Sequence, residues 1–80
     1  MATISLKTVI ADVLQIDPAQ LDDDSGMNVT DNWDSLNQFM ITTAIERDFG
    51  ARMIFSDIGD VSTLRAIRTF LQNQGVPFKD

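Results

Sequence analysis

Three consecutive residues, Asp34, Ser35 and Leu36, place a hydroxyl group at the expected start of a helix. Aspartate is a favoured N-cap, because its carboxylate accepts hydrogen bonds from backbone N–H groups that have no partner in the first helical turn. Ser35 then becomes the first helical residue, and we expect its hydroxyl to face outward. The free N–H groups and the positive end of the helix dipole also favour an anionic group here, such as a phosphodiester. The segment therefore predicts a serine that can be modified.

The same three residues have a simpler interpretation, in which Ser35 only takes part in an ordinary capping arrangement. Serine and aspartate are common at helix starts in many proteins. The three residues alone do not separate the two interpretations. The composition of the chain and the predicted helices and loops around the serine provide the further evidence.

The composition excludes several classes of function. The chain has 80 residues, of which 44% are hydrophobic, and this is enough for a modest core but not for a deep active-site cleft. It contains neither histidine nor cysteine, so it has no Ser-His pair, no thiolate metal site and no disulfide. Its net charge of -6 repels nucleic acids and anionic membranes and favours basic protein partners. We expect neither an enzyme nor a nucleic-acid-binding protein.

The start of the chain does not have the pattern of a targeting segment. Residues 1–16 carry Lys7 and Asp12 within an apolar pattern and contain no continuous hydrophobic stretch and no small-residue cleavage site. No stretch is long and apolar enough to cross a bilayer. The sequence predicts a cytoplasmic monomer without membrane insertion.

Apolar spacing of three and four residues predicts the first two main helices. The first covers 4–15, and we expect Asp17-Pro18 to end it, because the residue before a proline is pushed out of helical geometry. The second covers 35–49, after which Gly50 suits the C-terminal cap.

The remaining chain predicts a short helical turn begun by Ser56 and a last main helix. Ser62 or Thr63 can cap the last helix, and Gly75 with Pro77 stops it. Its buried stripe is expected to comprise Leu64, Ile67, Phe70 and Leu71. The fold class is therefore all-α, a small bundle of three main helices and one short helix, with a long loop between the first and the second.

The connection between Pro18 and Trp33 is long for so small a domain. Turn-forming and charged residues dominate it, while Leu21, Met27 and Val29 are expected to anchor it onto the core. Loops of this length in small domains are usually functional or disordered, and this one leads directly to the modifiable serine.

Two features of this connection have alternative interpretations. The acidic run is Asp22-Asp23-Asp24-Ser25-Gly26, and it does not place glycine and glutamate where a calcium-binding EF-hand loop requires them. We expect a solvated acidic turn and no metal site. Trp33, the only tryptophan, is expected to fasten the loop to the bundle, with a contact to a partner protein as the alternative.

The predicted helix 35–49 is apolar on two sides, which a simple surface helix is not. Ile41, Ile45 and Phe49 form one stripe, which can face the core. The other side is available to a partner or to cargo on the serine, and the expected partner-binding residues are Leu36, Phe39, Met40, Thr43, Glu46 and Arg47. The alternative is a central helix with both sides packed.

An acidic bundle of this size, with a long first connection leading to Asp-Ser-Leu, resembles an acyl carrier protein over nearly the whole chain. Residues 44–50, Ala-Ile-Glu-Arg-Asp-Phe-Gly, are similar to the family's hydrophobic, acidic, phenylalanine and small-residue run at the end of the second helix. The family's spacing into the last helix is matched by Met53, Val61, Thr63 and Leu64.

The resemblance implies that the chain, residues 1–80, is a single acyl carrier domain. Ser35 would be esterified with 4′-phosphopantetheine by a separate phosphopantetheinyl transferase that uses coenzyme A, and the thiol of this arm would hold acyl groups as thioesters. Asp34 would help the transferase to engage, and Leu36 would be touched by partners. An acyl-loading ligase or transferase and the synthases of the pathway are the further implied partners. The mechanism implied is carriage without catalysis.

Some residues depart from the members of the family that serve general fatty acid biosynthesis. Asn37, Met40 and Arg47 stand where those members commonly have carboxylates. Because enzymes of the general pathway present basic patches to that face, these residues should weaken such encounters. We hypothesise a specialised carrier for a dedicated lipid, polyketide or acyl-transfer pathway. The alternatives are a D-alanyl or other aminoacyl carrier and, from a different class, an unmodified acidic helical interaction module.

Overall fold

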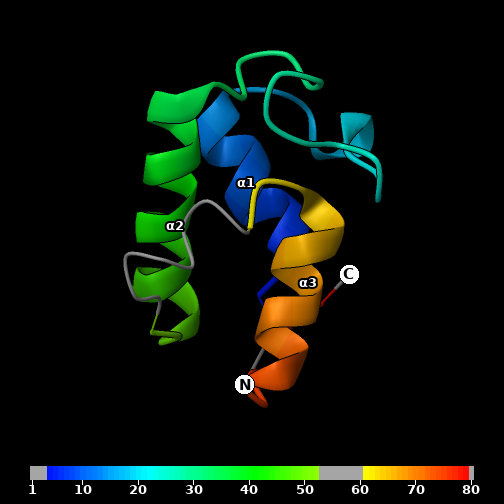
Figure 1. Ribbon diagram of the computed structural model, residues 1–80. Helices are drawn as coiled ribbons and strands as arrows, with labels where there is room; N and C mark the ends of the chain where they lie inside the picture. The colour runs from blue at the N-terminus through cyan, green and yellow to red at the C-terminus, as the bar shows by residue number, and fades with distance from the viewer. Residues whose placement is uncertain (1–3, 53–60, 80) are drawn as a thin grey trace.

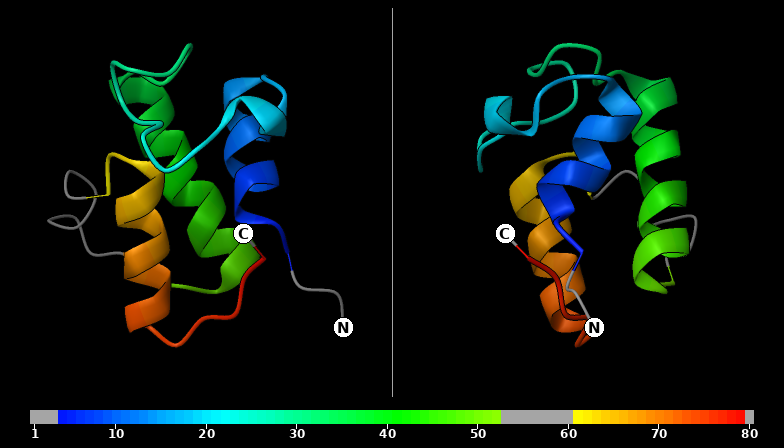
Figure 2. Two further views of the ribbon diagram at one scale, coloured as in Figure 1. Left: turned by 90° about the vertical axis from the view of Figure 1, so that its right-hand side faces the viewer. Right: turned by 180° about the vertical axis from the view of Figure 1, so that it is seen from behind.

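Three α-helices and one short 3-10 helix form the regular structure of the described residues, 4–52 and 61–79, in a computed structural model. In chain order they are α1 (Leu6–Leu14), η1 (Pro18–Gln20), α2 (Ser35–Phe49) and α3 (Leu64–Asn73). No β-strand occurs within these two ranges. In the view of Figure 1, α1 is seen between α2 and α3, whereas the left view of Figure 2 has α2 between the other two, so the three helices form a bundle. The connection from η1 to α2 passes over the end of the bundle where α2 begins. The predicted all-α class is confirmed.

The first helix ends earlier than the proline predicts. Gln15 has a left-handed backbone with φ of 57°, and α1 therefore ends at Leu14. Asp17 is extended, as expected before a proline, but its carboxylate begins the next element instead of ending α1. Asp17 Oδ1 accepts a hydrogen bond from Ala19 N at 2.9 Å and caps η1. The first helix is thus ended by the left-handed C-cap residue Gln15 and not by Asp17-Pro18.

The other helix ends follow the predicted caps. Gly50 closes α2 in the left-handed conformation with φ of 67°, which glycine adopts without steric cost. Thr63, and not Ser62, caps α3, because Thr63 Oγ1 accepts a hydrogen bond from Ala66 N at 3.1 Å. The predictions at Met53 and at the short helix begun by Ser56 lie outside the described residues.

The buried sides of the three helices meet in one hydrophobic core. Its helical members are Leu6, Val9, Ile10, Ala11 and Leu14 of α1, Ile41, Ala44 and Ile45 of α2, and Leu64, Ile67 and Leu71 of α3. Phe49 and Phe70 are partly buried and pack against them. Burying one such aliphatic side chain contributes about 1.5–3 kcal/mol, so the predicted apolar stripes account for most of the packing that holds the helices together.

The long connection is paired with the start of α3 by backbone hydrogen bonds. Met27 N donates to Ser62 O at 2.8 Å, and Leu64 N donates to Ser25 O at 2.9 Å. A Cβ atom at Gly26 would lie 2.9 Å from the Ser62 carbonyl oxygen, so the two backbone segments can approach this closely only because residue 26 is glycine. The connection therefore has a defined place on the bundle.

Two of the three predicted loop anchors are confirmed. Leu21 is buried and Met27 is partly buried against the core. Val29 is 76% exposed, so the prediction that it anchors the loop is wrong. The reason is a tight turn in which Val29 N and Thr30 N both donate to Gly26 O, and this turn directs residue 29 away from the core.

The segments just inside the two termini also pair. Leu6 N donates to Lys79 O and Lys79 N donates to Ile4 O, both at 2.9 Å. The right-hand view of Figure 2 shows the two segments side by side, away from the long connection. Within the described residues, none of the helices is long and apolar enough to pass through a bilayer.

Candidate functional site

The start of α2 has the predicted local geometry. Asp34 is its N-cap, and Asp34 Oδ1 accepts a hydrogen bond from Asn37 N at 2.9 Å. Ser35 follows as the first of 15 helical residues, and both Asp34 and Ser35 are exposed. The serine side chain is thus accessible at the positive end of a four-turn helix, where the first backbone N–H groups favour an anionic substituent.

Asn32 fixes the approach of the chain to this serine. Its backbone is left-handed with φ of 68°, and its Nδ2 donates to Leu14 O at 2.8 Å, which links it to the end of α1. Its own carbonyl oxygen accepts hydrogen bonds from Asn37 Nδ2 at 2.6 Å and from Asp34 N at 3.1 Å. The start of α2 is therefore tied to the C-terminal end of α1.

Trp33 is buried directly before the cap. It is 1% exposed, and its Nε1 donates to Gln38 Oε1 at 2.7 Å. Trp33 therefore fastens the loop to the bundle as predicted, and its burial excludes the alternative of a partner contact in this conformation.

Gln38 is a residue that the sequence analysis missed. It is 3% exposed, and its Nε2 donates to Val61 O at 2.8 Å. Gln38 precedes Ile41 and Ile45 at spacings of three and seven, so it lies on the side of α2 that faces the core. This spacing was the available signal that its amide group is buried.

The outer side of α2 is exposed over its whole length. Leu36 is 71% exposed, Phe39 52% and Met40 48%, whereas Ile41 and Ile45 on the inner side are fully buried. The alternative of a central helix packed on both sides is therefore wrong. All of the predicted partner-binding residues are exposed, namely Leu36, Phe39, Met40, Thr43, Glu46 and Arg47. We call this set the outer face of α2; its binding of partners stays a prediction.

The C-terminal part of the outer face carries a locally compensated charge. Arg47 Nε lies 2.9 Å from Asp48 Oδ1, and this hydrogen bond with Asp48 raises the pKa of the guanidinium above its usual value. The positive charge of Arg47 is thus offset by its neighbour. The N-terminal part of the face is apolar, with Leu36, Phe39 and Met40 exposed.

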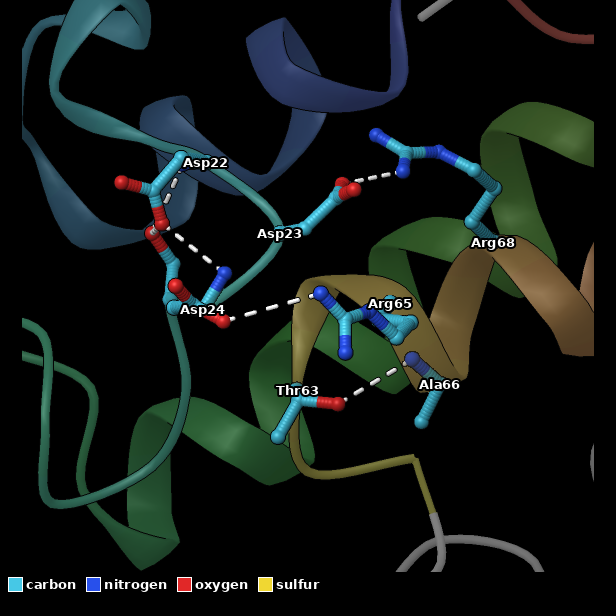
Figure 3. A network of polar contacts seen from close by, with 8 residues as sticks. Asp22, Asp23, Asp24, Thr63, Arg65, Ala66 and Arg68 are labelled. Atoms are coloured by element: carbon cyan, nitrogen blue, oxygen red, sulfur yellow. Dashed lines mark hydrogen bonds and ion pairs between the residues drawn. The ribbon is translucent and has the colours of Figure 1, made fainter.

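The acidic run of the connection is paired with α3, as Figure 3 shows. Asp23 forms an ion pair with Arg68, and Asp24 Oδ1 lies 3.6 Å from Arg65 Nη2. The hydrogen bond from Arg68 lowers the pKa of the Asp23 carboxyl below its usual value. The three aspartates are exposed, as expected of a solvated turn, and two of them also form ion pairs with α3 that the sequence did not predict.

The acidic turn does not form a metal centre. Asp22 Oδ1 accepts a hydrogen bond from Asp24 N at 2.9 Å, so it stabilises the turn itself. Across residues 4–52 and 61–79, no group of three or more carboxylates is placed to hold a metal ion.

A shallow cavity of about 330 Å³ lies within the long connection. It is lined by Ile16, Gln20, Asp22, Asp24, Ser25, Val29, Thr30 and Asp31. None of these residues belongs to α2, and three of them are carboxylates, so this cavity is separate from the serine and does not suit an apolar chain.

Comparison with known proteins finds a distant similarity to a named carrier protein. No family model matches the chain. Over 69 residues, which are 86% of this chain and 79% of the relative, it is 28% identical to polyketide-8 synthase acyl carrier protein 2 of Streptomyces avermitilis. The name of that relative describes an acyl carrier protein. This weak similarity extends over most of the chain and agrees with the resemblance to acyl carrier proteins noted in its sequence.

Proposed function

We propose that this protein holds acyl groups as thioesters on a 4′-phosphopantetheine arm attached to Ser35, and that it presents them to partner enzymes. The observation that carries the proposal is the place of Ser35, exposed as the first residue of α2 beside its Asp34 cap. A phosphodiester on this hydroxyl would lie next to the free N–H groups of the first helical turn. The similarity to an acyl carrier protein supports the same assignment.

Loading requires a separate phosphopantetheinyl transferase with coenzyme A as the donor. The bond that forms joins Ser35 Oγ to the phosphorus next to the pantetheine, and the bond that breaks joins this phosphorus to the bridging oxygen of the pyrophosphate. Adenosine 3′,5′-bisphosphate leaves, and the serine proton passes to a base that the transferase supplies. The contribution of the carrier is to hold the hydroxyl in place and to present Asp34 beside it.

The outer face of α2 is proposed as the surface that partner enzymes contact. Its N-terminal part is apolar, and exposed clusters of large apolar side chains at the surface of a small protein commonly mark interaction sites. The partners would be the transferase, an acyl-loading ligase or transferase, and the synthases of the pathway. The relative's name favours a polyketide pathway among the dedicated pathways. We propose that the carrier acts as a monomer in the cytoplasm.

The test is the intact mass of purified apo protein after incubation with coenzyme A, magnesium and a broad-specificity phosphopantetheinyl transferase. We expect a gain of one phosphopantetheine group in the native chain and none in Ser35→Ala. A known carrier loaded in parallel shows that the transferase is active. A folded native chain that gains no mass would overturn the proposal.

The exposed apolar side chains of α2 also suit a second candidate, an unmodified helical interaction module. In that case Ser35 would serve only in the cap, and the chain would bind a partner through the outer face without being loaded. The mass measurement separates the two candidates, because only the carrier gains the group.

A further inference from the structure

The amide of Gln38 is buried one helical turn after the serine, and both of its polar groups are used. Its Oε1 accepts a hydrogen bond from Trp33 Nε1 at 2.7 Å, and its Nε2 donates to Val61 O at 2.8 Å. Gln38 is 3% exposed and Trp33 is 1% exposed. A buried amide whose donor and acceptor are both paired has one favourable orientation, because turning it would leave several polar atoms without partners.

These bonds close a short ring of the chain that contains the exposed serine. Trp33 and Gln38 flank Asp34 and Ser35 in the chain, and their side chains are joined by the Nε1 to Oε1 bond. The backbone closes the same segment, since Gln38 N donates to Asp34 O at 2.8 Å. Ser35 therefore lies within a loop of chain that is closed twice, once by side chains and once by the backbone.

The same amide connects this loop to a distant part of the chain. Val61 lies 23 residues after Gln38 and is itself buried, and it comes just before the Thr63 cap of α3. The start of α2 is thus held against the start of α3 by one side chain. Any partner that rests on α2 and reacts with Ser35 depends on this relation, because transfer requires the hydroxyl at a fixed place relative to the docking surface.

We propose that Gln38 is a positioning residue for the modification of Ser35, acting through Trp33 and the Val61 carbonyl group. This inference rests on the proposed function, since it concerns the loading reaction. Gln38 does not touch the reacting atoms. It holds the first turn of α2 in one orientation. When the transferase is docked, the Ser35 hydroxyl then lies in line with the phosphorus of coenzyme A that this hydroxyl attacks.

The test uses the variant Gln38→Met, which keeps the length of the side chain and removes both hydrogen bonds. Its matched control is Gln72→Met, the same change at an exposed position of α3. Trp33→Phe is a second variant, which removes the Nε1 donor together with part of the buried ring and leaves the bond between Gln38 and Val61. All variants are studied as the full chain, at a temperature where circular dichroism shows them to be folded.

The measurement is the steady-state rate of loading by the transferase over a range of carrier concentrations. We expect kcat of Gln38→Met to fall roughly 10- to 100-fold with little change in KM, because the outer face still docks while the hydroxyl is misplaced. Trp33→Phe should show a smaller fall, and the double variant should be no slower than Gln38→Met, since the two residues act as one unit. Gln72→Met should match the native chain.

A purely structural role for Gln38 predicts a different result. In that case the folded Gln38→Met variant would load with native kcat and KM, and the inference would be overturned. If Gln38→Met does not fold, an unchanged kcat for folded Trp33→Phe would overturn it in the same way.

A native chain that is not loaded at all would contradict the proposed function, and the inference then has a separate readout. Amide hydrogen exchange should become faster in Gln38→Met at the first turn of α2 and not in the rest of the helix. Unchanged exchange at this turn would show that Gln38 does not position it.

Discussion

The helices α2 and α3 begin in the same way, yet their outer sides carry different residues. Asp34 and Thr63 each accept a hydrogen bond from the backbone N–H three residues later, at 2.9 and 3.1 Å. The exposed residues of α3 are polar, namely Arg65, Thr69, Gln72 and Asn73. The exposed side of α2 instead carries Leu36, Phe39 and Met40.

The difference separates residues needed for folding from residues that serve another purpose. Apolar side chains stabilise a fold when they leave water, and the outer residues of α2 remain about half exposed or more. Helix α3 packs onto the same core with a polar outer side, so the fold does not require apolar residues there. We therefore propose that the outer face of α2 is kept apolar for contact with another molecule.

The largest expected effect is on stability, at the inner side of α2. Ile45 is fully buried, and Ile45→Ala should lower the free energy of unfolding by about 2–5 kcal/mol, since it leaves a cavity in the core. Leu36→Ala is the control on the outer face and should change it by no more than about 0.5 kcal/mol. Urea unfolding measures both. Equal losses in the two variants would mean that the outer face belongs to the core.

The next effect concerns loading and not stability. Phe39→Ala should slow transferase loading at low carrier concentration by about tenfold, or about 1.4 kcal/mol, because an exposed aromatic side chain can supply much of the energy of docking. Thr69→Ala, on the exposed side of α3, is the matched control and should load at the native rate. Native loading by Phe39→Ala would show that the transferase does not use this part of the face.

The two caps offer a third comparison. Thr63→Ala removes a hydrogen bond to Ala66 N and should cost about 1 kcal/mol of stability with unchanged loading of the folded protein. Asp34→Asn keeps an equally good cap, so its stability should stay within a few tenths of a kcal/mol of the native value. Its loading should nevertheless fall, because the carboxylate beside Ser35 is lost. Thermal unfolding and the loading rate are measured on both variants. If Asp34→Asn loads at the native rate, Asp34 serves only as the cap of α2 and has no role in loading.

The smallest effect is expected at the ion pair between Asp23 and Arg68. The Arg68 hydrogen bond lowers the pKa of the folded Asp23 carboxyl below its ordinary 3.8. The ion pair therefore stabilises the fold at any pH above 3.8, and this stabilisation is lost as the pH falls through the lower pKa of the folded state. Asp23→Asn should therefore be slightly less stable than the native chain at neutral pH, and equally stable in strong acid. Added salt should reduce the difference at neutral pH. Urea unfolding across pH measures it, and a difference that grew toward acid would contradict this account.

The start of α2 could be predicted from sequence because its signals are local. An aspartate before a run with four-residue apolar spacing determines both the cap and the first helical residue, and the Asp34 to Asn37 bond agrees with this. The same holds for Thr63 at the start of α3 and for Gly50 after α2.

The unpredicted features depend on contacts between distant residues. The bond from Gln38 to Val61 spans 23 residues, and the pair of Arg68 with Asp23 spans 45. Local periodicity does not reveal such partners, so the burial of Gln38 and the ion pairs of the exposed acidic run were both missed. Val29 was misplaced for a related reason, because the backbone turn at Gly26 overrides its apolar character.

The most direct test of the central claim is to locate the added group after loading, by proteolysis and tandem mass spectrometry of the native chain. Ser5, Ser35 and Thr63 all place a hydroxyl at the start of a helix, but Ser5 and Thr63 use it as the cap of α1 and α3, whereas Asp34 caps α2 and leaves Ser35 exposed. We therefore predict phosphopantetheine on Ser35 alone. A modified residue other than Ser35, or peptides that all remain unmodified, would contradict the account.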